Sequence, residues 1–118
     1  MGRRVPVMQS ISRSPAFHLG VKYVSNWAAL AAVAPADFFM QPSMLAPVKD
    51  TLPVIVAQGD VDTIVPVANT RRWVSAMEEM KMKYKYIEVR GADHGSVLGS
   101  AMPAIFEFFK EHTKSATQ

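Results

Sequence analysis

The sequence contains no cysteine among its 118 residues. Disulfide bridges, thiolate metal sites and a cysteine nucleophile are therefore excluded. Histidine is also scarce, and His18, His94 and His112 show no metal-ligand spacing. There is no glycine-rich loop of the kind that binds phosphate groups. We therefore expect a protein that uses neither a metal ion nor another cofactor.

Long apolar runs and charge of one sign are missing as well. The longest apolar run, Trp27 to Pro35, is far too short to cross a bilayer. The first residues lack the apolar core of a signal peptide. The formal net charge is only +3, and the basic residues are scattered among acidic ones. These features argue against nucleic-acid and membrane partners and predict a cytoplasmic protein.

The composition is that of a globular protein, with 49% apolar and 19% charged residues. The length predicts a single domain over residues 1–118. Strands are predicted at Val5–Met8, Trp27–Val33, Leu52–Ala57 and Tyr84–Val89. Helices are predicted from Ser14 to about Tyr23, from Val67 to Met82, and from Ser100 and Pro103 to His112, with a long loop over Pro35–Thr51. This alternation predicts an α/β fold with a mainly parallel sheet of about four strands flanked by helices.

Two polar loops follow the last two predicted strands. Asp62 lies in the loop Gln58–Pro66, and His94 lies in the loop Gly91–Gly95. Because parallel strands end at one edge of a sheet and neighbours are about 5 Å apart, these two side chains are expected to meet. An acid and a histidine are two of the three parts that activate a serine nucleophile. Asp60 is expected to shape the turn instead.

The same loops carry a resemblance to a known family, the α/β-hydrolase-fold enzymes. The likeness includes Gly59-Asp60-Val61-Asp62-Thr63-Ile64-Val65-Pro66, which resembles the segment after the seventh strand, and Gly91-Ala92-Asp93-His94-Gly95, which resembles the segment after the eighth. Residues 17–23 and 27–35 are similar to the helix and strand after the nucleophile. The likeness is closest to dienelactone-hydrolase, polyhydroxyalkanoate-depolymerase and feruloyl-esterase enzymes. It covers only the second half of that fold and implies Asp62 as triad acid and His94 as triad base.

The resemblance implies that Ser10 is the nucleophile. The family pattern there is Gly-x-Ser-x-Gly, whereas this chain has Met8-Gln9-Ser10-Ile11-Ser12, so both glycines are missing. Ser12, Ser14 and Ser96 therefore remain alternatives. The resemblance further implies the backbone N–H of Ile11 as one oxyanion donor. The family's second donor belongs to a loop outside the half that this chain resembles.

These residues predict a cofactor-free serine carboxylesterase that cleaves small-molecule esters. Short acyl chains are expected, because half of the fold leaves little room for a deep acyl tunnel. One alternative is a non-catalytic remnant of the fold that serves self-association or partner binding, and another is a fragment of a longer gene. The edge strand Val5–Met8 and the apolar loop that carries Phe38, Phe39, Met40, Met44 and Leu45 predict a homodimer or higher homo-oligomer.

Overall fold

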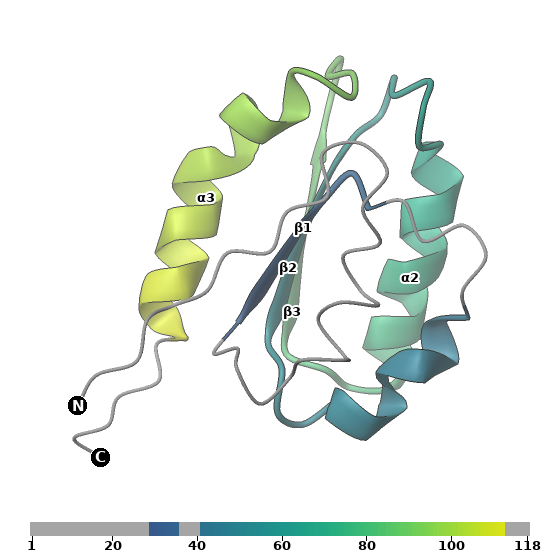
Figure 1. Cartoon of the computed structure of the whole chain (residues 1–118), viewed down its shortest axis with the longest axis vertical. Helices are drawn as coiled ribbons and strands as arrows, with labels where there is room; N and C mark the ends of the chain where they lie inside the picture. Colours follow the sequence, from purple (N-terminus) through teal and green to yellow (C-terminus); the bar gives the residue numbers. More distant parts are fainter. Residues whose placement is uncertain (1–28, 36–40, 113–118) are drawn as a thin grey trace.

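The computed structural model describes residues 29–35 and 41–112 of the chain. Its elements are, in order, β1 (Leu30–Val33), the 3₁₀ helix η2 (Pro42–Val48), β2 (Val54–Gly59), α2 (Val67–Glu79), β3 (Tyr84–Val89) and α3 (Val97–Glu111). The strands form one parallel sheet in the order β1-β2-β3. Figure 1 shows α2 and η2 on one face of this sheet and α3 on the other.

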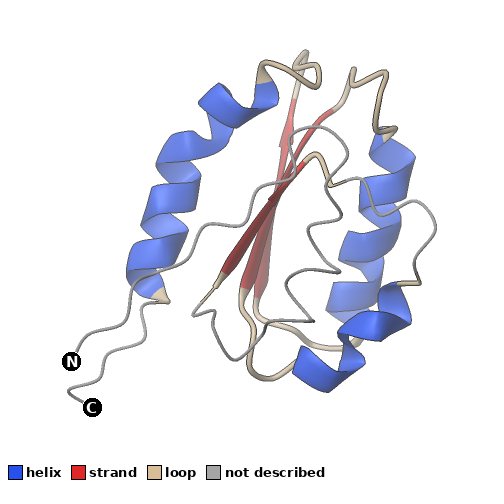
Figure 2. Ribbon diagram, viewed as in Figure 1, coloured by secondary structure: helices blue, strands red, loops and turns tan. Residues whose placement is uncertain are grey.

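This three-layer arrangement confirms the predicted fold class, an α/β fold with a parallel sheet between helices (Figure 2). The predicted first strand, Val5–Met8, and the helix near Ser14 lie outside the described residues. Among the described helices, none combines the length and the apolar character needed to cross a bilayer.

The two faces of the sheet belong to two separate cores. Alternate residues of each strand point to opposite faces, so β2 contributes Val54 and Val56 to one core and Ile55 and Ala57 to the other. The core under α2 and η2 also contains Leu30, Leu45, Val48, Leu52, Trp73, Met77 and Met82. The core under α3 also contains Val33, Ala92, Val97, Ala101, Ile105, Phe108 and Phe109. Burial on both faces explains why β1 and β2 lack the polar alternation of a half-exposed strand.

The strand β2 begins and ends two residues later than predicted. Leu52 is buried, but its N–H donates to Val48 O and so closes the turn after η2. The hydrogen bonds to the neighbouring segments at this end are those from Leu30 N–H to Pro53 O and from Val54 N–H to Lys83 O. At the other end the strand continues through Gln58 and Gly59, both of which are buried. The polar character of Gln58 did not end the strand, because its side chain finds partners in the interior.

The helix α2 ends at Glu79, three residues before the predicted end. Lys81 adopts a left-handed conformation with φ 57°. Its N–H donates to Glu78 O, and the N–H of Met82 donates to Met77 O. These two bonds form a Schellman motif, accompanied by burial of Met77 and Met82 in the same core. The sequence does not indicate this helix end, because a lysine occupies the position that usually holds glycine.

The segment predicted as a long loop contains the 3₁₀ helix η2. Pro42 occupies its first turn, and Pro47 lies inside it. Leu45 and Val48 are buried in the core that η2 shares with α2. Leu45 is therefore a core residue and does not belong to a free apolar surface, while Phe38 and Phe39 lie outside the described residues.

A surface ion pair fixes α2 against the edge strand β3. The guanidinium of Arg71 donates two hydrogen bonds to the Glu88 carboxylate, at 2.9 and 2.6 Å. The Tyr86 hydroxyl donates a third, at 2.6 Å. These bonds, led by that from Arg71, lower the pKa of Glu88 to about 2. Since the pair is partly exposed, its contribution to stability is small.

Candidate active site

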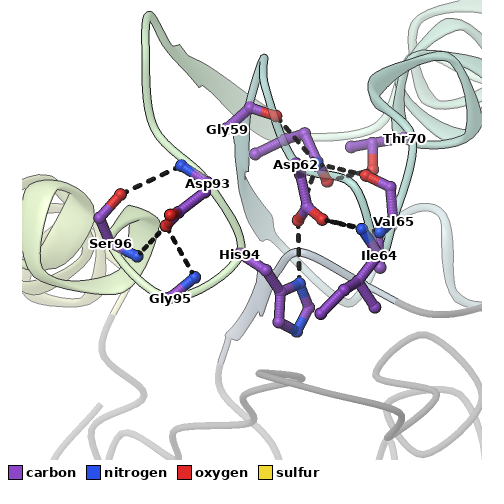
Figure 3. Close-up of polar contacts among 10 residues, drawn as sticks. Gly59, Asp62, Ile64, Val65, Thr70, Asp93, His94, Gly95 and Ser96 are labelled. Carbon is purple, nitrogen blue, oxygen red and sulfur yellow. Dashed lines mark hydrogen bonds and ion pairs between the residues drawn. The ribbon is translucent and has the colours of Figure 1, made fainter.

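The loops that carry Asp62 and His94 leave the sheet at the same edge. Gly59 and Val89 are paired in the parallel register of β2 and β3, and each is the last residue of its strand. The chain from Gly59 and the chain from Val89 therefore start side by side. His94 Nδ1 lies 2.9 Å from Asp62 Oδ2 (Figure 3). The acid and the imidazole that the sequence singled out are thus in direct contact.

Gly59 permits this close approach of the two loops. A β-carbon at position 59 would lie 2.1 Å from the carbonyl oxygen of Ala92, which no side-chain rotation could relieve. With glycine at this position, the two loops come close enough to form backbone hydrogen bonds with each other. Val61 N–H donates to Ala92 O at 3.2 Å, and Asp60 N–H donates to Val89 O at 3.1 Å. A glycine is required here for steric reasons, because its neighbour is backbone.

Asp60 connects the loops through its side chain. Its Oδ1 accepts the N–H of Gly91 at 2.7 Å, and Gly91 is in the left-handed region with φ 75°. Glycine adopts this conformation without the strain that a β-carbon would cause. The carboxylate of Asp60 therefore has a structural role in holding the turn after β3 against the turn after β2.

The Asp62 carboxylate is enclosed by hydrogen-bond donors. Its side chain is 0% exposed. Oδ1 accepts the N–H groups of Ile64 and Val65, each at 2.7 Å. Oδ2 accepts from His94 Nδ1 and, at 3.3 Å, from Gln58 Nε2. An ionised carboxylate can only accept hydrogen bonds, and each of these contacts is made by a nitrogen that can donate one.

Gln58 and Thr70 complete this network and were not predicted as site residues. Gln58 is 0% exposed, although four apolar residues precede it in β2. Its Nε2 also lies 2.9 Å from Val65 O and 3.1 Å from Gly59 O. Thr70, buried in the first turns of α2, donates its hydroxyl to Gln58 Oε1 at 2.6 Å. The sequence feature that could have indicated this role is the glutamine at the end of an apolar strand, directly before Gly59 and Asp60.

His94 sits in a turn that begins the helix α3. The Asp93 carboxylate accepts the N–H groups of Gly95 and Ser96, at 3.0 and 2.8 Å. The Ser96 hydroxyl in return accepts the N–H of Asp93 at 3.1 Å, which is the reciprocal pattern of a capping box. The bond from Ser96 N–H is the main cause that lowers the pKa of Asp93. The helix α3 begins directly after this turn at Val97, before the predicted start at Ser100 and Pro103, and its N-cap residue Ser96 makes no side-chain cap hydrogen bond.

The protonation of His94 follows from its partner. Because the Asp62 carboxylate can only accept, His94 Nδ1 must carry the proton of the bond between them. In the neutral ring, Nε2 then has a free lone pair. That nitrogen is shielded from solvent and has no hydrogen-bond partner within residues 29–35 and 41–112. The pair can therefore accept a proton at Nε2 and stabilise the resulting imidazolium through Asp62.

The predicted nucleophile and its oxyanion donor, Ser10 and Ile11, lie outside the described residues, as do Ser12 and Ser14. Ser96 is described, and its hydroxyl accepts the N–H of Asp93 in the turn before α3. In Figure 3 the Ser96 side chain turns back to Asp93, on the side of the loop away from the imidazole. In the described part of the chain, no group of three or more acidic or histidine side chains is arranged to hold a metal ion.

No protein-family model matches the sequence, and no curated protein matches it. Among solved structures the chain is similar to a thermostable esterase, with 23% sequence identity and a TM-score of 0.70. The similarity covers 84% of this chain and 28% of the esterase chain. The chain thus spans about 28% of the length of that esterase. This likeness shows a hydrolase-like fold.

Proposed function

We propose that the protein is a serine hydrolase of the carboxylesterase type. The observation that carries the proposal is the bond between His94 Nδ1 and Asp62 Oδ2, with Nε2 left unpartnered among the described residues. This arrangement is the acid and base half of a serine triad, at the sheet edge where ligands bind in open α/β folds. The similarity to a thermostable esterase supports esters as the substrate class.

In the proposed mechanism Ser10 Oγ attacks the carbonyl carbon of the ester while His94 Nε2 takes the hydroxyl proton. The negative charge that develops on the carbonyl oxygen is bound by the backbone N–H of Ile11. The bond to the alcohol then breaks, and His94 returns the proton to the leaving oxygen. Water attacks the acyl-enzyme in the same way, which releases the acid and restores Ser10. Asp62 holds the ring in the required tautomer throughout.

The substrates of this proposal are small carboxylic esters with short acyl chains, cleaved without a cofactor. A homodimer in the cytoplasm remains the prediction from the sequence. The second candidate function is a binding module built on the same fold. It is favoured by the missing glycines on both sides of Ser10.

The two candidates differ in their reaction with a fluorophosphonate probe, which labels an activated serine. We expect labelling of wild type at Ser10, located by mass spectrometry of the modified peptide, and its loss in Ser10→Ala. The matched controls Ser12→Ala and Ser96→Ala should keep it. Wild type should hydrolyse p-nitrophenyl acetate faster than the decanoate ester, and this hydrolysis should disappear in Ser10→Ala.

Each other outcome has a defined meaning. Label on Ser12 or Ser96 would keep the enzyme and move the nucleophile. Equal hydrolysis by wild type and Ser10→Ala would remove Ser10 from this role. No label on any serine of the folded protein would overturn the hydrolase proposal in favour of the binding module.

A further inference from the structure

The amide of Gln58 is the one fully buried polar side chain of β2, and packing alone does not account for it. Burial of an amide is unfavourable unless its hydrogen bonds are replaced. An apolar residue of the same volume would continue the pattern of the strand without that requirement. Among the described residues, the side-chain hydrogen bonds of Gln58 are directed to the Asp62 loop, the strand end and α2.

The orientation of this amide is determined by its neighbours. The three groups near Nε2 are Gly59 O, Val65 O and an oxygen of the Asp62 carboxylate, all of which can only accept. The NH₂ group must therefore face the loop. The amide oxygen then faces Thr70, whose hydroxyl must be the donor of the 2.6 Å bond. Hydrogen bonds are thus donated in one direction, from the Thr70 hydroxyl to the Gln58 amide and from that amide to the Asp62 carboxylate.

Gln58 acts on Asp62 in two ways. It donates directly to Oδ2, the same oxygen that accepts from His94 Nδ1. It also holds the carbonyl of Val65, the residue whose N–H donates to Asp62 Oδ1. Both carboxylate oxygens are thus oriented by contacts that begin at one amide. Thr70 anchors that amide to α2, an element outside the loop.

We propose that Gln58, anchored by Thr70, is the positioning residue that aligns the Asp62 carboxylate with His94 Nδ1. The inference rests on the proposed function, in which that alignment selects the tautomer with the proton on Nδ1. Without the amide, the carboxylate can rotate within its loop, and the imidazole loses the partner that determines its tautomer. Gln58 itself does not touch the reacting atoms.

The test compares two pairs of variants by NMR and by kinetics. Gln58→Met keeps the approximate volume and removes the amide. Thr70→Val keeps the shape and removes the hydroxyl, and Thr70→Ser restores the hydroxyl. Thr51→Val is the matched control, since the Thr51 hydroxyl bonds only the local Val48 carbonyl, at 3.4 Å. The imidazole signals of His94, assigned with His94→Gln, report the Nδ1–H tautomer without reference to activity.

We expect the Nδ1–H tautomer of His94 in wild type, Thr70→Ser and Thr51→Val, and a loss of that single tautomer in Gln58→Met and Thr70→Val. The esterase kcat should fall by about tenfold to a hundredfold in the latter two with KM little changed, as is typical for loss of a group that orients a functional side chain. Wild-type imidazole signals in both Gln58→Met and Thr70→Val would overturn the inference. If Gln58→Met does not fold, the Thr70→Val and Thr70→Ser pair decides.

The positioning role of Gln58 and the proposed esterase activity can be refuted independently of each other. A wild type that no fluorophosphonate probe labels, but whose His94 tautomer depends on Gln58, would refute the esterase and keep the positioning role. A labelled wild type whose tautomer and kcat are unchanged in Gln58→Met and Thr70→Val would keep the esterase and refute the positioning role.

Discussion

The loop after β2 and the loop after β3 each present one half of the acid–base pair, but different contacts hold them. The Asp62 side chain is fully buried, and its donors include Gln58 from the strand as well as the backbone of its own loop. The His94 turn is bonded mainly within itself, through the cap between Asp93 and Ser96. Its flanking residues are exposed. The two loops are bonded to each other through Asp60 and Val61, but the acid also receives a donor from the strand, whereas the residues next to the histidine bond one another in a local turn.

The proposed mechanism would use this difference. In it the acid acts as a carboxylate away from water, which needs several donors from different parts of the chain. The histidine must present Nε2 to a group that arrives from elsewhere, so only one side of its ring can be bound. The Asp62 loop should therefore tolerate substitutions less well than the His94 turn. Three substitutions test this comparison, from the largest expected effect to the smallest.

Asp62→Asn should have the largest effect, on catalysis. The amide can donate to His94 Nδ1, and the ring then adopts the tautomer with its proton on Nε2, which cannot act as the base. We expect a fall in the kcat of ester hydrolysis of about 10⁴-fold, the loss seen for this change in serine proteases. Asp50→Asn, at an exposed carboxylate paired only with its neighbour Lys49, is the control. An Asp62→Asn protein with more than a tenth of wild-type kcat would contradict the assignment.

Gly59→Ala should mainly reduce stability, because the new methyl group would overlap the Ala92 carbonyl and force the two loops apart. Overpacking of this kind lowers the free energy of unfolding by about 1–3 kcal/mol. Urea unfolding followed by circular dichroism measures it. Gly99→Ala is the matched control, since Gly99 lies in α3 with nothing near its added β-carbon. Equal stabilities of the two variants would show that the loops can separate without cost.

Asp93→Ala should have the smallest effect and reveal the local nature of the His94 turn. Because the folded pKa of Asp93 is lowered, its ionised form stabilises the fold above the usual pKa of an aspartate, and this contribution is lost as pH falls through the folded pKa. The melting temperature of the variant should therefore lie slightly below that of wild type near pH 7 and converge with it in acid. Asp93→Asn keeps an acceptor oxygen, so its melting temperature near pH 7 should lie between those of wild type and Asp93→Ala. A constant difference at every pH would contradict the electrostatic origin.

The fold and the contact between Asp62 and His94 could be predicted from the sequence to a large extent. The bounds of β3 were predicted to the residue, because Tyr84–Val89 is a short, largely apolar run that a polar loop follows. The end of α2 was not, since Lys81 takes the place of the usual glycine. The 3₁₀ helix η2 was missed because its prolines indicate a loop. The roles of Gln58 and Thr70 were missed because the two residues are twelve positions apart and meet only when α2 packs on β2.

The amino-acid sequence by itself determined the alternation of strands and helices and the order in which an acid and a histidine follow neighbouring strands. Those features depend on local propensity and on apolar periodicity, which each short segment carries alone. Only the tertiary structure decided which oxygen of Asp62 meets His94, which nitrogen of the ring is left unpartnered among the described residues, and which buried amide holds the acid. Such contacts depend on distances between segments, and packing of the helices on the sheet is what establishes those distances.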